Sequence, residues 1–183
     1  VRANASLKQE IAERKQVEES IIKSERTLKS LFKAVPTGIG MVRNRVLINV
    51  NDKLCEMTGY QREELIKQSA RMLYPSQAEF NFVGEEKYRQ ISSSGTGTVE
   101  TRWRHKTGTI MDILLSSTPV DEKDWLEGVT FAALDISIRK RAEQVVKESE
   151  KKYRTLIETT DTGFVIVDEK GNVIEANETY VRM

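Results

Sequence analysis

The sequence has only one cysteine, Cys55, and only one histidine, His105. A single cysteine excludes an internal disulfide and fits a reducing compartment. A single histidine without cysteine partners excludes a structural zinc site. The uninterrupted apolar runs, such as residues 113–115, have the length of a strand, whereas a membrane-spanning helix needs about 18 residues. We therefore expect a cytoplasmic fragment without a metal site or a membrane segment, even if the full-length protein is anchored in a membrane elsewhere.

An excess of one charge is also lacking. The 29 basic and 28 acidic residues give a net charge of +1, so no general field attracts nucleic acid, and we predict no nucleic-acid partner. Apolar residues make up 38% of the 183 residues and charged residues 31%. Charge of that density indicates long solvated helices beside a core of ordinary size. No nucleophile–base set, carboxylate pair or phosphate-binding loop stands out, so the fragment is predicted not to be an enzyme.

The chain contains an internal repeat. The segment at 10–25, EIAERKQVEESIIKSE, returns at 135–150 as DISIRKRAEQVVKESE, 125 positions later, and after one inserted residue the match continues to Asn51 and Asn177. Identical pairs in the helical part are Ile11/Ile136, Arg14/Arg139, Lys15/Lys140, Glu18/Glu143, Ser24/Ser149 and Glu25/Glu150. Repeat arrays have periods of up to about 50 residues. This longer period indicates two tandem domains joined by helices, the second of them truncated.

Residues 3–33 contain no proline or glycine, which predicts one long helix. With Ile11 at position a, the heptad seam reads Ile11, Arg14, Glu18, Ile21, Glu25, Leu28 and Phe32. The second copy has polar residues at the same places, so the heptad is weak. We expect a marginally stable two-helix coiled coil that joins two chains into a homodimer. A lone solvated connector is the alternative.

The next elements are short. Residues 36–40, PTGIG, end the helix, and two apolar runs predict a hairpin that turns at Asn44. Asn51 is expected to cap the helix that follows, and Ser76 to form a capping box with Glu79. The predicted strands are 39–43 and 46–50, the helices 52–57, 62–68 and 76–91, and the loops 71–75 and 92–97.

From Thr98 onward the apolar period changes to two. The predicted strands are 98–104, 109–119 and 128–136, with a turn at 106–108, a loop at 120–127 and a helix from 137 to 158. Five antiparallel strands with helices on one face define an α+β domain. Because the last two strands carry apolar residues on both faces, we expect the N-terminal helix or a second subunit to cover the other face.

Together these motifs resemble a PAS domain with its C-terminal PAC motif, in the tandem arrangement of a prokaryotic multidomain sensor. The motifs that carry the resemblance are Asn51 before a helix, MTGY at 57–60, EEL at 63–65, the turn at Gly108 and DIS at 135–137. The resemblance covers 25–137 in full and 150–183 in part. Two positions depart from the family pattern, with Lys67 in place of the usual glycine and Thr107 in place of the usual aspartate.

The resemblance implies a sheet order of 2-1-5-4-3 and a sensory or dimerisation role. It divides the chain into a linker helix at 1–24, a complete PAS domain at 25–137, and a linker helix with the start of a second PAS domain at 138–183. The expected whole is a sensor histidine kinase of a two-component system, with neighbouring PAS and output domains as partners. A diguanylate cyclase or phosphodiesterase, or a ligand-free dimerisation spacer, is the alternative.

An aromatic cluster is expected between the long helix and the sheet. These aromatic residues either form the core or line an apolar pocket for a small ligand, and a nearby hydroxyl is placed to bind a polar ligand group. The candidate pocket residues are Tyr74, Tyr88, Trp103, Ser117 and Phe131.

No resident cofactor is expected. Relatives that form a flavin adduct carry a cysteine in an NCRFLQ motif, which is absent here, so Cys55 is interpreted as a small buried thiol. Haem-binding relatives use a histidine on the long helix, and residues 76–91 contain none. His105 is expected to be a solvated turn residue.

The end of the last strand is the predicted point of signal relay. The predicted relay residues are Asp135, Ile136 and Ser137, together with Arg104. We expect the Asp135 carboxylate to pair with a base on a neighbouring strand or turn, so that distortion of the sheet reaches the following helix. The candidate bases are Arg102, Arg104 and Lys106.

Overall fold

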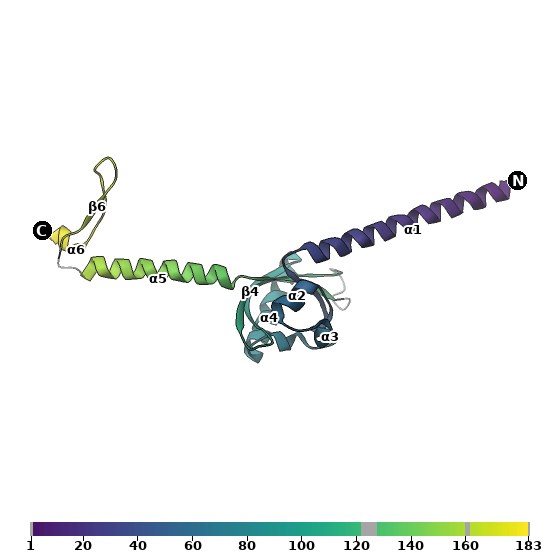
Figure 1. Ribbon diagram of the computed structural model, residues 1–183, viewed down its shortest axis with the longest axis horizontal. Helices are drawn as coiled ribbons and strands as arrows, with labels where there is room; N and C mark the ends of the chain where they lie inside the picture. Colours follow the sequence, from purple (N-terminus) through teal and green to yellow (C-terminus); the bar gives the residue numbers. More distant parts are fainter. Residues whose placement is uncertain (1, 122–127, 160–161, 183) are drawn as a thin grey trace. The chain divides into compact units, whose positions relative to one another are not determined.

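The computed structural model describes residues 2–121, 128–159 and 162–182, and it divides into two compact units, Val1–Ile136 and Ser137–Met183 (Figure 1). In the first unit the elements are α1 (Arg2–Ala34), β1 (Gly38–Arg43), β2 (Val46–Val50), α2 (Asp52–Thr58), α3 (Arg62–Leu65), the 3₁₀ helix η1 (Ala70–Leu73), α4 (Gln77–Ser94), β3 (Gly97–Arg104), β4 (Ile110–Pro119) and β5 (Val129–Asp135). In the second they are α5 (Ser137–Thr159), β6 (Val165–Val167), β7 (Val173–Ala176) and α6 (Glu178–Arg182). Most of the loop expected at 120–127 lies outside the described residues.

The first unit holds one antiparallel sheet of five strands in the order β2-β1-β5-β4-β3. This confirms the predicted α+β architecture and its sheet order. Helix α2 packs on β1, and α4 packs on β3 and β4. Every second residue of β3 is buried, from Gly97 to Trp103, because side chains of a strand alternate between the two faces. The core therefore lies between this face and the helices.

Helix α3 is shorter than predicted. It ends at Leu65 rather than at residue 68, because the next residues hydrogen bond to β2 instead of continuing the helix. The Lys67 N–H donates to the Leu47 carbonyl over 2.8 Å, and the Leu47 N–H donates to the Gln68 carbonyl over 2.9 Å. Lys67 has a φ of 65°, which glycine adopts more readily. The tight turn is thus present without the glycine that is usual there.

Helix α4 is longer than predicted. Its N-cap is Ser76, whose hydroxyl accepts from the Glu79 N–H over 3.1 Å. The other hydrogen bond of the expected capping box, from the Ser76 N–H to the Glu79 carboxylate, was predicted wrongly. The Glu79 carboxylate accepts instead from the Thr101 hydroxyl and the Arg102 side chain. The helix continues to Ser94, since the serine hydroxyls at its end donate back to carbonyls one turn earlier. Similarly, η1 replaces the first part of the loop expected at 71–75.

The opposite face of the sheet carries exposed apolar side chains. Ile110 on β4 is 47% exposed and Leu134 on β5 is 43% exposed. No element in the described part of this chain buries these two side chains. Covering of this face by a second subunit remains a prediction.

The second unit repeats the opening of the first. Its two strands pair as an antiparallel hairpin around a turn longer than that between β1 and β2. The Asp168 carboxylate closes this turn by accepting from the Lys170 and Asn172 N–H groups, each over 2.8 Å. Apolar side chains such as Val173 and Ile174 are exposed. A hairpin of this size is marginal in isolation, so this unit by itself is an incomplete core.

Candidate functional site

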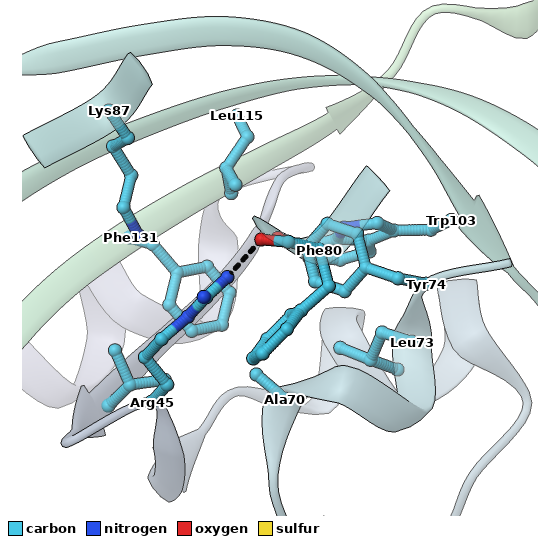
Figure 2. A pocket seen from close by; sticks show the side chains of 10 residues that line it. Arg45, Ala70, Leu73, Tyr74, Phe80, Lys87, Trp103, Leu115 and Phe131 are labelled. Carbon is cyan, nitrogen blue, oxygen red and sulfur yellow. Dashed lines mark hydrogen bonds between the residues drawn. The ribbon is translucent and has the colours of Figure 1, made fainter. Parts of the chain in front are cut away.

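A small cavity of about 20 Å³ lies between the helix-covered face of the sheet and helix α4 (Figure 2). A cavity needs about 10–15 Å³ on this measure to hold one water molecule. The wall is largely apolar and is formed by residues of the strands, of η1 and α4, of the turn between β1 and β2 and of the segment after η1. Its lining residues are Val42, Arg45, Ala70, Leu73, Tyr74, Phe80, Lys87, Trp103, Leu115 and Phe131.

Aromatic rings form one side of the cavity. Tyr74 meets Phe80 edge to face with ring centroids 5.3 Å apart, and it meets Trp103 at 6.1 Å. Trp103 in turn meets Phe131 at 6.1 Å. These T-shaped contacts are the favoured geometry for aromatic pairs. Burial raises the pKa of the Tyr74 hydroxyl to about 12, so this group is a neutral hydrogen-bonding group at physiological pH.

Three of the five predicted pocket residues line this cavity, namely Tyr74, Trp103 and Phe131. Tyr88 packs against the core without lining the cavity. Ser117 is buried on β4, in register with Phe131. The structure thus places the predicted cluster together but gives only part of it to the cavity.

Arg45 was not predicted as a site residue. It lies in the turn between β1 and β2 with a φ of 63°, a region that costs an L-residue roughly 1–2 kcal/mol. Its guanidinium folds back over the Phe80 ring, 3.2 Å from the centroid, and donates to the Phe80 carbonyl (Figure 2). Gly84 on α4 leaves the space for it, since a Cβ there would lie 2.7 Å from Arg45 Nη1. Burial lowers the pKa of Arg45.

Lys87 is the second cation that sequence reasoning missed. It lies on the inner face of α4 and is only 7% exposed. Burial, and after it the charge of Arg45, lowers the pKa of Lys87 to about 8. A signal for it was present, because Lys87 continues the helical spacing of the buried Phe80, Val83 and Ile91. A lysine in such an apolar stripe is rarely buried without a reason.

Two further polar side-chain atoms in the core lack partners among the described residues. They are Trp103 Nε1 and Ser117 Oγ, both buried. The Trp103 side chain lies close enough to the Tyr74 hydroxyl to oppose the rise that burial causes in the Tyr74 pKa, but the two groups do not meet the geometry of a hydrogen bond. Buried polar atoms nearly always have a partner, so an unpartnered one calls for an explanation.

The predicted relay residues lie at the end of β5. Asp135 is in register with Ile113 of β4. Ile136 is 4% exposed, and its N–H donates to the Asp112 carbonyl over 2.8 Å. Ser137 is the first residue of α5. Only Ile136 therefore separates the last strand from the helix.

Two of the three bases proposed to pair with Asp135 have carboxylate partners of their own. Arg102 forms an ion pair with Glu79 at 3.0 Å, and Lys106 forms one with Glu64 at 2.6 Å. Arg104 lies on β3, which β4 separates from β5. The pairing of Asp135 with a base and its relay role both stay predictions.

Neither Cys55 nor His105 lines the cavity. Burial raises the pKa of the Cys55 thiol, which disfavours the nucleophilic thiolate. His105 was expected to be solvated, but it is half-buried against Gly59, and its Nδ1 lies 2.8 Å from the Thr107 hydroxyl. Across the described ranges, no cluster of acidic, cysteine and histidine side chains could hold a metal ion. No described helix has the length and apolar character to cross a membrane.

Comparison with known proteins identifies the class of this fold. The family profile described as a PAS domain matches residues 36–137, and a second PAS-domain profile matches residues 151–183. The chain therefore belongs to the PAS domain family, with a second PAS segment after the first.

Individual relatives agree with this assignment. The sensor protein TdiS of Thauera aromatica is 29% identical over 127 residues, which are 69% of this chain and 23% of that protein. This chain thus spans about a quarter of the length of that relative. The PAS domain of a LuxR-family transcriptional regulator from Burkholderia thailandensis, in complex with ethanol, is 26% identical with a TM-score of 0.56, over 60% of this chain and 96% of that one. An RNA-binding light-oxygen-voltage receptor, at 16% identity and a TM-score of 0.56, covers 69% of this chain and 37% of its own, and shows the fold alone.

Proposed function

We propose that this chain is the sensory module of a sensor histidine kinase of a two-component system, and that it relays the state of its sheet through α5. The observation that carries the proposal is the junction at Ile136. This residue is buried in the first unit and lies between the end of β5 and the start of α5. A shift of the strand therefore has a direct covalent path into the helix.

The sensor-protein relative supports a place in signal transduction. The cavity supports sensing by a ligand, and the PAS domain of the Burkholderia regulator contains a two-carbon ligand, ethanol. In this proposal the fragment has no catalytic role of its own. It carries no resident cofactor, and chemistry belongs to an output domain elsewhere in the full-length cytoplasmic or membrane-anchored protein.

We further propose that two chains associate through α1 and α5. Apolar side chains at the predicted seam are exposed in the single chain, including Ile21 and Leu28 on α1 and Val146 and Tyr153 on α5. Exposed apolar side chains at heptad spacing are buried when a coiled coil forms.

Radiolabelled nucleotides given to the purified full-length protein test the assignment. A histidine kinase incorporates the γ-phosphate of ATP into an acid-labile, base-stable phosphohistidine. Formation of a cyclic dinucleotide from GTP, or its hydrolysis, would replace the kinase by the diguanylate cyclase or phosphodiesterase alternative. A protein with neither activity would overturn both output assignments.

A further inference from the structure

Helix α1 is attached to the five-stranded body near its C-terminal end. The side chains from residue 13 to residue 31 are exposed, whereas Phe32, in the last turn, is half-buried. The last carbonyl groups of a helix have no partner within the helix, so they can bond to another element. A movement of α1 therefore reaches the body through the groups that bind this last turn.

Asn51 binds the end of α1 with one half of its amide and the body with the other half. Its NH₂ group donates to the carbonyls of Phe32, on the helix, and of Thr37, on the connector after it. Its oxygen accepts from the N–H groups of Ile39 on β1 and Leu54 on α2. Asn51 is 1% exposed, so water does not compete for these bonds. The four bonds bridge the helix and two elements of the body.

A helix cap alone does not require this amide. Capping needs one side-chain oxygen that accepts from a backbone N–H group, and aspartate and serine supply it about as well as asparagine. The donor half of the amide is what aspartate lacks, and it is the half that holds α1. Attachment of the helix therefore explains the choice of asparagine better than capping does.

The second PAS segment contains the same bridge. Asn177 is 3% exposed, and it donates over 3.0 Å to the carbonyl of Ile157, in the last turn of α5, and over 2.9 Å to that of Thr162. Its oxygen accepts from the N–H groups of Phe164 and Tyr180 over 2.8 and 3.0 Å. The partners in both copies are backbone groups, so the bridge is retained although the side chains differ and the hairpin turn is longer.

Helix α5 is held at both of its ends. It begins directly after Ile136, which follows the last strand of the first sheet, and its last turn is held by Asn177. A movement that leaves the first PAS domain along α5 therefore reaches the opening of the second segment through the same kind of contact that α1 makes with the first.

We propose that Asn51 and Asn177 are input couplers. Each transfers a displacement of the linker helix before it to the start of the hairpin and to the helix after the hairpin in its own PAS segment. Because one amide makes all four bonds, it cannot follow the helix carbonyl without shifting the N–H groups that its oxygen holds. The proposed function above concerns the exit of a signal at Ile136, and this inference adds its entry. It does not depend on which output domain the full-length protein carries.

Asn51→Asp separates the two halves of the bridge. The aspartate keeps oxygen acceptors for the N–H groups of Ile39 and Leu54, but an ionised carboxylate cannot donate to the carbonyls of Phe32 and Thr37. Hydrogen exchange of the 183-residue chain, followed amide by amide with NMR, measures the result. We expect exchange in residues 31–35 to become about fivefold faster, as loss of one hydrogen bond implies, while exchange in α2 and β4 stays unchanged.

Asn49→Asp adds the same charge to an exposed side chain of β2, and as the control it is expected to change neither region. Exchange in residues 31–35 equal to that of the parent would show that the amide does not hold α1. An equal increase in residues 31–35 and in α2 would reduce Asn51 to a cap and overturn the proposal. If the buried carboxylate prevents folding, Asn51→Ser, which supplies an uncharged cap, takes its place in the same measurement.

A second substitution tests whether movement is transferred. Ser30→Pro disrupts α1 just before its last turn, because proline removes a helix hydrogen bond and kinks the helix. In the parent it is expected to speed exchange of the Leu54 N–H at least about fivefold, the lower end for coupled sites. In the Asn51→Asp background it is expected to have no further effect, since the helix is no longer bound. Equal effects of Ser30→Pro in the two backgrounds would exclude transfer through this amide.

The second coupler is tested in the same way. Asn177→Asp is expected to speed exchange in the last turn of α5 and to leave residues 31–35 unchanged. Unchanged exchange in the last turn of α5 would overturn the proposal for the second segment.

Discussion

The side-chain amide of Asn51 donates a hydrogen bond of 3.1 Å to the carbonyl of Phe32, in the last turn of α1. The same amide donates to the Thr37 carbonyl over 3.0 Å. Its oxygen accepts from the N–H groups of Ile39 and Leu54, each over 2.9 Å. One buried side chain thus joins the end of α1, the first strand and the start of α2.

The second unit contains the same arrangement. Asn177 donates to the carbonyls of Ile157 and Thr162 and accepts from the N–H groups of Phe164 and Tyr180. Each partner is the residue that the internal repeat pairs with its counterpart around Asn51. A linker helix is therefore fastened to the PAS sheet in the same way in both copies.

Replacing Asn51 by alanine is expected to destabilise the first unit by about 3 kcal/mol, because buried N–H and carbonyl groups would lose their partners. Urea unfolding followed by tryptophan fluorescence measures this change. Asn49→Ala is the matched control, since the Asn49 side chain is exposed and, within the described part of the chain, accepts only from the neighbouring Val50 N–H. Equal stability of the two variants would contradict the anchoring role of Asn51.

Replacing Lys67 by glycine is expected to stabilise the protein by about 0.5–1 kcal/mol. Lys67 has a φ of 65°, and glycine relieves this strain at the cost of a more flexible unfolded chain. Lys67→Ala keeps the Cβ atom and is expected to bring no gain. A comparison of urea midpoints for the two variants measures the difference, and a larger gain from alanine would show that strain is not the cause.

The turn at Lys67 also shows which part of the fold could not be predicted from the sequence. The alternation of β3 and the cap at Asn51 depend on neighbouring residues, so both could be predicted from the sequence. The early end of α3 depends instead on pairing of Lys67 with Leu47, twenty positions away in the chain. A local pattern contains no information on that competing partner.

The site was predictable only in its apolar half. Aromatic residues on central strands point to a core or a pocket, and Trp103 and Phe131 were found in this way. Arg45 and Lys87 contradict the usual exposure of charged residues. Their convergence depends on a turn conformation and on a gap at Gly84, which appear only when the turn and α4 are placed together in the fold.

Replacing Asp135 by asparagine is expected to alter output more than stability. The side chain is exposed, so loss of its charge is expected to change the free energy of unfolding by less than about 1 kcal/mol. Coupling between sites is typically worth about 1–3 kcal/mol, or roughly 5- to 150-fold in an equilibrium. The rate of autophosphorylation of the full-length variant measures this change. Glu63→Gln removes an exposed carboxylate from α3 as the control, and equal rates in the two variants would remove Asp135 from the relay.

Stability is expected to rise between pH 8 and 10 because of Lys87. Its pKa is about 8 in the folded chain against an ordinary value of 10.5, so in this range the unfolded chain binds more protons and stability increases with pH. The full difference corresponds to about 3 kcal/mol. Above pH 10 Tyr74 loses its proton in the unfolded chain but keeps it in the folded chain, where its pKa is about 12. Stability is therefore expected to fall again as the pH rises from 10 to 12. The groups that face Lys87 are Arg45 and Tyr88.

Urea unfolding at pH 7, 8, 9 and 10 measures this profile. Lys87→Met is expected to be more stable than the parent at pH 7 and to lose the rise, whereas Arg89→Met is expected to keep it. A parallel profile in Lys87→Met would show that another group causes the pH dependence.

Replacing Leu28 by lysine is expected to convert a dimer of the chain into monomers. Leu28 occupies a seam position of the predicted coiled coil and is 65% exposed in the single chain. A charge at this position has to be buried when two helices pair, and burial of an unpaired charge opposes association. Ser30→Lys places the same charge on the outer side of the same helix and is expected to leave the dimer intact. Light scattering coupled to size-exclusion chromatography gives the mass of each variant. Because the seam of α1 is only half apolar, one charge is expected to be sufficient, and a Leu28→Lys protein that remains dimeric would place the interface on the exposed face of the sheet around Ile110 and Leu134 instead.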